Sequence, residues 1–222
     1  MSKLITRTLT GFLFVALIIA SVVYDVPPRV ILFNVFGFIC LYEYFQLVRK
    51  IFSNSILKII ASTALGIIYC IIPFYLLNAS GNLIFITQYQ YELILGFFII
   101  LWASDTGAYL VGTAIGKHKL APKISPKKSI EGLAGGLLTA LLAAFIFSKF
   151  YTILRLQDWL IVSMVIAIPG VFGDLLESYL KRKANVKDSG NLLPGHGGFL
   201  DRFDALLLAA PCYFFYLKYV IC

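Results

Sequence analysis

The residues best suited to chemistry lie in positions 178–204, with the sequence SYLKRKANVKDSGNLLPGHGGFLDRFD. This stretch holds five cations, three carboxylates, one histidine and four glycines in a chain that is otherwise mostly apolar. Cations and closely approaching backbone bind phosphate, carboxylate oxygens bind metal ions, and glycine permits the turns that bring these groups together. The composition therefore predicts a site for phosphate and metal.

Just upstream, a polar stripe is predicted on one helix face. Asp174, Glu177, Ser178 and Lys181 follow the spacing i, i+3, i+4 and i+7. An amphipathic helix end with ion pairs, each worth roughly a few tenths of a kcal/mol, explains this stripe equally well. The position of Asp174 within the apolar span favours a functional site, because an unpaired carboxylate among glycines and leucines is costly. A divalent ion commonly offsets that cost.

The glycine-rich segment leads into a further predicted helix that carries Asp201 and Asp204 in its first turn. A helix N-terminus favours anions, and the spacing of three residues places both acids toward a shared site. His196 has glycines on both sides, and we expect it to order the loop or to contact phosphate. A general acid–base role for His196 is left open.

A lysine-rich loop within residues 105–136 forms the third element. Its tightest cluster, SPKKSIEG at 125–132, combines hydroxyl and ammonium groups that suit a nucleoside triphosphate or a phospholipid headgroup. A topogenic or lipid-surface patch is the alternative for the lysines of 117–123. We interpret His118 as a solvated loop residue.

The elements that position these residues are predicted to be membrane-spanning helices. The chain has 222 residues, of which 60% are hydrophobic and 14% charged, and its mean hydropathy is +0.88. These values indicate an integral membrane protein. We predict an all-α polytopic bundle of about seven spans, at residues 8–25, 30–48, 56–77, 91–112, 132–150, 159–180 and 203–222. It forms one domain over 1–222, with N-terminal spans in 1–90 and catalytic helices and cytoplasmic loops in 91–222.

Charge distribution predicts the orientation of these spans. With the N-terminus in the cytoplasm and the C-terminus outside, fifteen of the 19 Lys and Arg residues fall on the cytoplasmic side. The net charge of +8 therefore reflects topology and anionic lipid, and nucleic acid is excluded as a partner. The same orientation places acids of the last four spans at one cytoplasmic level, with Asp105 among them. This clustering predicts a cytoplasm-facing cavity. Glu43 either belongs to that cavity or extends to the membrane interface.

These motifs resemble the signature of the phosphatidate cytidylyltransferase family, also called CDP-diacylglycerol synthases. The resemblance is carried by SYLKR, KDSG and LPGHGGFLDRFD, with DTGAY and ISPKKSIEG as two further blocks in the family's order. It covers roughly residues 105–204. Departures from the family pattern are Ser129 in place of the usual threonine, Ile130 in place of tryptophan, and Thr113 where a basic residue is common.

The resemblance implies a Mg²⁺-dependent reaction of CTP with phosphatidic acid that yields CDP-diacylglycerol and pyrophosphate for phospholipid biosynthesis. Asp174, Asp201 and Lys181 are the implied catalytic residues, and Asp174, Asp201 and Asp204 the implied metal ligands. The residues expected at the substrates are Ser125, Pro126, Lys127, Lys128, Ser129, Glu131, Ser178, Arg182, Lys187, Asp188, His196 and Arg202. A second cation and a homodimer are left open. The implied location is the bacterial cytoplasmic (inner) membrane, with the site facing the cytoplasm.

Two other functions remain as alternatives. A CTP-dependent lipid kinase of the polyprenol or phytol type also joins nucleotide loops to an apolar bundle, but it releases CDP rather than pyrophosphate. A membrane transporter also places acids at a membrane cavity, although the polar residues here gather at the cytoplasmic edge and the chain shows no paired halves.

Overall fold

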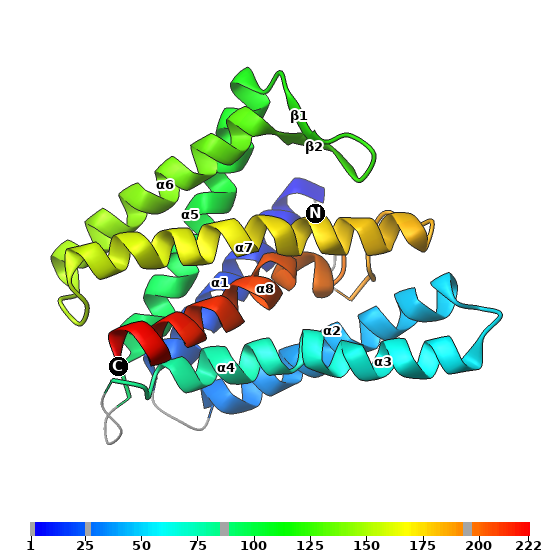
Figure 1. The fold of residues 1–222 in the computed structure, drawn as a ribbon, viewed down its shortest axis with the longest axis horizontal. Coiled ribbons are helices and arrows are strands. Elements are labelled where there is room, and N and C mark those ends of the chain that lie inside the picture. The colour runs from blue at the N-terminus through cyan, green and yellow to red at the C-terminus, as the bar shows by residue number, and fades with distance from the viewer. Residues whose placement is uncertain (1–2, 25–27, 85–88, 193–196) are drawn as a thin grey trace.

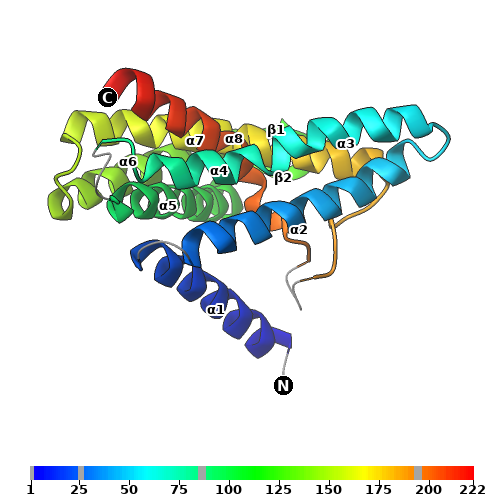
Figure 2. The ribbon, with the colours of Figure 1, turned by 90° about the horizontal axis from the view of Figure 1, so that it is seen from below.

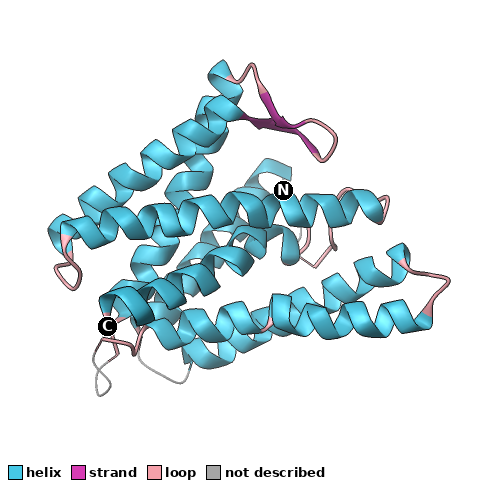
Figure 3. Cartoon of the chain, in the orientation of Figure 1, coloured by secondary structure: helices cyan, strands magenta, loops and turns pink. Residues whose placement is uncertain are grey.

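The computed structural model describes residues 3–24, 28–84, 89–192 and 197–222 (Figure 1). Most of this chain is helical, as Figure 3 shows. The helices are α1 (Lys3–Val23), α2 (Pro28–Ile51), α3 (Ile56–Cys70), α4 (Ile72–Ser80), α5 (Tyr91–Ile115), α6 (Ile130–Phe150), α7 (Leu156–Lys183) and α8 (Leu200–Tyr216), which continues into the π-helical turn η1 (Leu217–Ile221). Strands β1 (Lys119–Ala121) and β2 (Ser125–Ser129) connect α5 to α6.

The predicted membrane-spanning architecture is confirmed. Within the described residues, six helical segments are long and apolar enough to cross a bilayer: Arg29–Ile51, Ile56–Ser80, Tyr91–Ile115, Ile130–Phe150, Leu156–Lys183 and Leu200–Ile221. A shorter apolar helix, Gly11–Val23, corresponds to the first predicted span. Helices α3 and α4 together form one span, interrupted near Pro73, which cannot donate a helical hydrogen bond. The chain is therefore a polytopic helical membrane protein.

The hairpin between α5 and α6 is the main departure from the predicted all-α fold. The sequence predicts a loop here, but Lys119 pairs with Ser129 and Ala121 with Ser125 in an antiparallel arrangement. Ser129 then ends β2 and caps α6, because its Oγ accepts the Gly132 N–H at 3.1 Å. The strand therefore runs directly into a helix, with no flexible linker between them.

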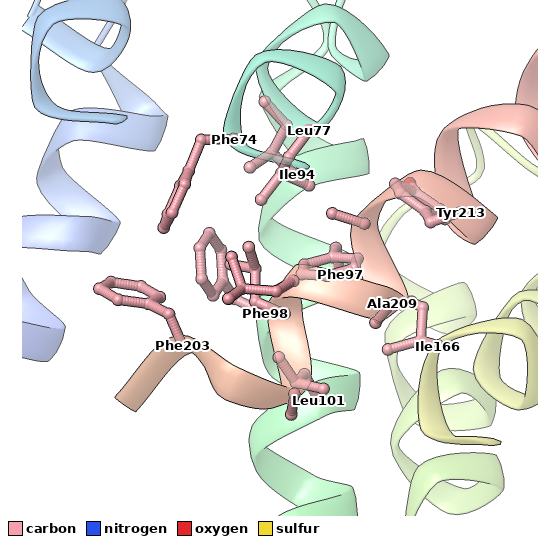
Figure 4. Close-up of a cluster of buried hydrophobic side chains, with 14 of the residues drawn as sticks. Phe74, Leu77, Ile94, Phe97, Phe98, Leu101, Ile166, Phe203, Ala209 and Tyr213 are labelled. Atoms are coloured by element: carbon pink, nitrogen blue, oxygen red, sulfur yellow. The ribbon is translucent and has the colours of Figure 1, made fainter. Parts of the chain in front are cut away.

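Helix α8 lies in the interior of the bundle and supplies much of its apolar core. In Figure 4, side chains of α4, α5, α7 and α8 meet, with Phe74, Phe98 and Phe203 grouped together. The ring centroids of Phe74 and Phe203 are 5.1 Å apart. Further along α8, the Tyr213 hydroxyl donates to the Leu93 carbonyl at 2.9 Å, so this buried polar group is satisfied. Helix α8 is thus packed against α4 and α5 along its length, and its N-terminus lies at the polar end of the bundle.

Helix α1 lies at the margin and diverges from the other helices toward the N-terminus, as Figure 2 shows. Its contacts with the core include Phe14, whose ring lies 5.5 Å from that of Phe203 and 5.8 Å from that of Phe36, and the buried side chains of Ile18 and Val22. Helix α1 therefore joins the core through one face, at a spacing of four residues.

Small residues allow α5 and α6 to pack closely. A Cβ added to Gly132 would lie 2.8 Å from the Ala108 carbonyl oxygen, and one added to Gly136 would lie 2.9 Å from the Ser104 carbonyl oxygen. Backbone contact of this kind is typical of helices that associate within a membrane. It fixes the start of α6, and with it the position of the hairpin.

A similar close contact joins α7 to α8. Gly173 faces the backbone of Asp204, and an added Cβ would overlap the Asp204 carbonyl oxygen. The contact brings Asp174, the next residue of α7, to the level of Asp204. The crossing of these two helices therefore determines the spacing of two of the predicted site acids.

We expect Gly173→Ala to destabilise the protein by about 1–3 kcal/mol, because the added methyl group forces α7 and α8 apart. The control is Gly170→Ala in the same helix, where the nearest atom to the new methyl is the flexible end of Leu101, at 3.2 Å. The measurement is thermal unfolding in detergent. Equal melting temperatures for the two variants would contradict the importance of this contact.

Candidate active site

Three carboxylates from three helices gather where α7 crosses α8. They are Asp105 of α5, Asp174 of α7 and Asp204 of α8, which are close enough for Asp174 to repel both of the others electrostatically. Lys128 of β2 supplies opposite charge, with its Nζ 2.5 Å from Asp174 Oδ2. The hairpin therefore contributes a cation to an acidic cluster. The SPKK sequence predicts that this lysine contacts substrate, and in this structure it contacts Asp174.

A second charged group lies further along α7. Lys181 Nζ is 2.5 Å from Glu177 Oε2 and 2.6 Å from Asp201 Oδ1. Glu177 is fully buried and Lys181 largely so. In surroundings of low polarity, removing one member of such a group leaves a costly unpaired charge. Lys181, an implied catalytic residue, is thus paired with two acids in this structure.

Asp201 also closes the segment between α7 and α8. Its Oδ2 accepts the Ser189 N–H at 3.0 Å and the Gly198 N–H at 2.9 Å. These donors stand at the two ends of the glycine-rich loop, so Asp201 holds the ends together. Gly197 lies beside them with φ of 86°, a left-handed conformation that favours glycine. His196, Gly195 and Pro194 lie outside the described residues.

Glu43 of α2 is the site residue whose role the sequence left open. It is 1% exposed. It accepts the Phe199 N–H at 3.1 Å, the Leu200 N–H at 2.9 Å and the Ser189 hydroxyl at 2.7 Å. Glu43 therefore belongs to the polar end of the bundle and does not extend to the interface. A carboxylate within a predicted span was a signal for such a role, but the partners are some 150 positions away.

The hairpin is anchored by a residue predicted to contact substrate. Glu131 accepts the backbone N–H groups of Lys117, at 3.1 Å, and of His118, at 3.2 Å. The His118 ring, predicted to be a solvated loop group, is exposed but lies 2.6 Å from Glu131 through Nδ1. On the other side, Arg182 Nε donates to the Ile124 carbonyl at 3.2 Å. Glu131 and Arg182 thus hold the hairpin between α6 and α7.

The remaining predicted site residues divide into two sets. Ser178 lies within the site, where its hydroxyl donates to Asp174 Oδ1 at 3.3 Å. Within the described part of the chain, three others form no side-chain hydrogen bond or ion pair, namely Lys127, Lys187 and Asp188. All three are exposed, as are Pro126 and Arg202, while Ser125 is half-buried. Lys127, Lys187 and Asp188 are therefore exposed to ligands but are not organised by contacts of their own.

The predicted metal ligands do not form one ligand set in this arrangement. Among the described residues, no group of three or more His, Cys, Asp or Glu side chains is gathered tightly enough to hold a metal ion. Asp174 faces Lys128, and Asp201 faces Lys181 and the loop. The donor chemistry nevertheless suits Mg²⁺, which prefers carboxylate oxygens. In this structure the Lys128 and Lys181 ammonium groups contact the carboxylate oxygens of Asp174 and Asp201 that would serve as metal ligands.

Taken together, the fold and site define an integral membrane protein with clustered carboxylates and cations at one end of a helical bundle. Residues 53–220 match the model of the Cytidylyltransferase family, and the chain belongs to this family.

Relatives in three bacteria carry the name phosphatidate cytidylyltransferase. The chain is 48% identical to the protein of Haemophilus influenzae over 134 residues, which is 58% of this chain and 46% of the relative. It is 40% identical to that of Bacillus subtilis over 183 residues, 82% of this chain and 66% of the relative. It is 48% identical to that of Staphylococcus haemolyticus over 116 residues, which is 51% of this chain and 44% of the relative. The chain thus spans about half to two thirds of the length of these relatives.

We expect Glu131→Ala to release the hairpin, because two backbone donors and the His118 ring lose their acceptor. A hydrogen bond to a charged group is worth about 1.5–3 kcal/mol, so tryptic cleavage after Lys119, Lys123 or Lys127 should accelerate by at least about tenfold. Glu92→Ala, at the opposite end of α5, is the control. Unchanged cleavage in Glu131→Ala would show that the hairpin is held by other contacts.

Proposed function

We propose that the protein transfers the CMP group of CTP to phosphatidic acid, giving CDP-diacylglycerol and pyrophosphate. Membership of the Cytidylyltransferase family and the names of the bacterial relatives support this assignment. The structural observation that carries it is the meeting of Asp105, Asp174 and Asp204 with Lys128, because this cluster lies wholly within the family-matching residues. Carboxylates beside cations suit a reaction of phosphate groups.

In this reaction a phosphate oxygen of phosphatidic acid attacks the α-phosphorus of CTP. The bond from that phosphorus to the oxygen bridging to the β-phosphate breaks, and pyrophosphate leaves with the electron pair. Phosphatidic acid is already ionised at neutral pH, so the site needs no strong general base. The main obstacles are repulsion between two polyanions and the charge that develops on the leaving group.

Cations of this chain address both obstacles. Lys128 and Lys181 exchange carboxylate partners for substrate phosphates, while Arg182 and Arg202 are exposed and carry the guanidinium fork that binds phosphate bidentately. Ser125 and Lys127 of the same hairpin are proposed as further substrate contacts, although they alternate with Lys128 along β2. We assign CTP to the cytosolic opening of this region and phosphatidic acid to its lipid-facing side.

Mg²⁺ is part of the proposal. Asp174, Asp201 and Asp204 are the residues proposed to hold it. When bound, the ion supplies charge neutralisation and alignment of the triphosphate. The proposed location is the bacterial cytoplasmic membrane with the site facing the cytoplasm, which the predicted excess of cations on that side supports.

The decisive assay combines purified protein, labelled CTP, phosphatidic acid and Mg²⁺. We expect pyrophosphate and CDP-diacylglycerol in equal amounts, loss of both on chelation with EDTA, and recovery when Mg²⁺ is added back. Release of CDP with a phosphorylated lipid would instead identify a kinase. Ion flux in proteoliposomes without nucleotide chemistry would identify a transporter.

We expect Asp174→Asn and Asp201→Asn each to lower kcat by about a hundredfold or more, because each removes a carboxylate proposed to hold the Mg²⁺ that neutralises the triphosphate. Asp158→Asn is a matched control, since Asp158 lies in the first turn of α7, at the far end of the helix from Asp174. Turnover is measured on protein that remains monodisperse in detergent. Near-normal product formation by either site variant would overturn the assignment of that residue.

A further inference from the structure

Glu43 is a buried acid that the proposed chemistry does not use. It lies ahead of residues 53–220, which match the family. It is 1% exposed and sits in α2 between Tyr42 and Tyr44. A carboxylate at such a position is expensive unless its oxygens are fully hydrogen-bonded.

The hydrogen bonds of Glu43 satisfy the N-terminus of α8. Phe199, the residue at the cap position of α8, provides no side-chain hydrogen bond to the helix. Glu43 Oε1 accepts the Phe199 N–H and Oε2 accepts the Leu200 N–H, so two otherwise orphaned donors are paired. The negative charge also interacts favourably with the positive end of the helix dipole. Glu43 thus acts as a capping residue supplied by a distant helix.

The loop backbone encloses this carboxylate closely. An added Cβ at Gly190 would overlap Glu43 Oε1, and one at Gly198 would overlap Glu43 Oε2 and Ser189 Oγ. Glycine at these two positions therefore permits the loop ends to approach Glu43. The contact between Glu43 and the loop therefore depends on the buried carboxylate and on the absence of side chains at Gly190 and Gly198.

Ser189 connects Glu43 to Asp201. Its hydroxyl lies 2.7 Å from Glu43 Oε2 and 3.1 Å from Asp201 Oδ2. Its single proton is donated to one of them, while its backbone N–H donates to Asp201 Oδ2. Glu43 and Asp201 therefore hold the same loop residue from opposite sides, and Asp201 in turn contacts Lys181.

We propose that Glu43 is a positioning residue for the active site: it fixes the start of α8 and, through Ser189, the orientation of Asp201. This inference rests on the proposed function for its catalytic consequence. Glu43 is not a catalytic residue, because its carboxylate is enclosed by loop backbone and is 1% exposed. Its effect on chemistry passes through α8, which carries Asp201 and Asp204.

The test uses Glu43→Gln, Ser189→Ala and the double variant, with Glu92→Gln as a matched control outside the site. Glutamine nearly preserves the volume of glutamate but presents an NH₂ group to a backbone N–H, so one cap bond is replaced by two opposed donors. Two measurements are made on monodisperse protein. One is steady-state kinetics with CTP and phosphatidic acid, and the other is hydrogen exchange of peptides from the α8 N-terminus and from α5.

If Glu43 positions the site, kcat/KM for CTP falls at least about tenfold in Glu43→Gln, while KM for phosphatidic acid stays within about twofold. Hydrogen exchange accelerates at 197–204 and not in α5. Ser189→Ala shows a smaller defect, and the double variant loses less than the product of the two single losses because both act on one connection. Glu92→Gln matches the unchanged protein in both measurements.

Three results would overturn the proposal. One is wild-type kinetics with wild-type exchange in folded Glu43→Gln. Another is faster exchange throughout the bundle, α5 included, which would assign Glu43 to general stability. If Glu43→Gln does not fold, Glu43→Asp and Ser189→Ala replace it, and normal kinetics and exchange in both would be the third. Absence of any cytidylyltransferase activity in the unchanged protein would refute the proposed function alone, and exchange at 197–204 would still decide whether Glu43 holds α8.

Discussion

Carboxylates within an apolar bundle must be matched by cations or by N–H donors, and this requirement organises the polar end of the molecule. Asp174 is matched by a lysine from the hairpin, Asp201 by Lys181 and two backbone donors, and Glu43 by the N-terminus of α8. Leaving one partner of a buried pair unmatched costs about 3–5 kcal/mol, against about 0–1 kcal/mol for an exposed pair. The requirement therefore forces α2, α7, α8 and the hairpin to meet in one place.

Features set by spacing within one helix could be predicted from the sequence. The spans follow from runs of apolar residues, and their positions agree with the helices observed. The shared face of Asp174, Ser178 and Lys181 follows from helical periodicity, and the Ser178 hydroxyl does contact Asp174. Asp201 lies in the first turn of α8, as predicted, with Asp204 one residue beyond that turn.

Features set by pairing between distant segments could not be predicted. The hairpin lacks a clear alternation of apolar and polar residues, and its position depends on Glu131, which binds backbone more than ten residues away. Neighbouring residues of a strand point to opposite faces, so only one of Lys127 and Lys128 reaches Asp174. The sequence motif predicted both lysines as site residues, but it did not indicate which of them would contact Asp174. Glu43 is a stronger case, since its partners lie beyond residue 188.

The contact at Gly173 limits how the site can respond to a substrate. Because Gly173 lies against the backbone of Asp204, α7 and α8 cannot separate to relieve repulsion between Asp174 and Asp204 without losing their packing. In the described structure Lys128 is the close cation of Asp174 and also acts on Asp105, whereas Lys181 is the cation that acts on Asp204. If a polyanionic nucleotide is the substrate, Lys128 cannot serve the acids and the phosphates in full at once. Additional positive charge must then accompany the nucleotide, so binding of CTP and binding of a divalent cation should be thermodynamically coupled through the crossing of α7 and α8.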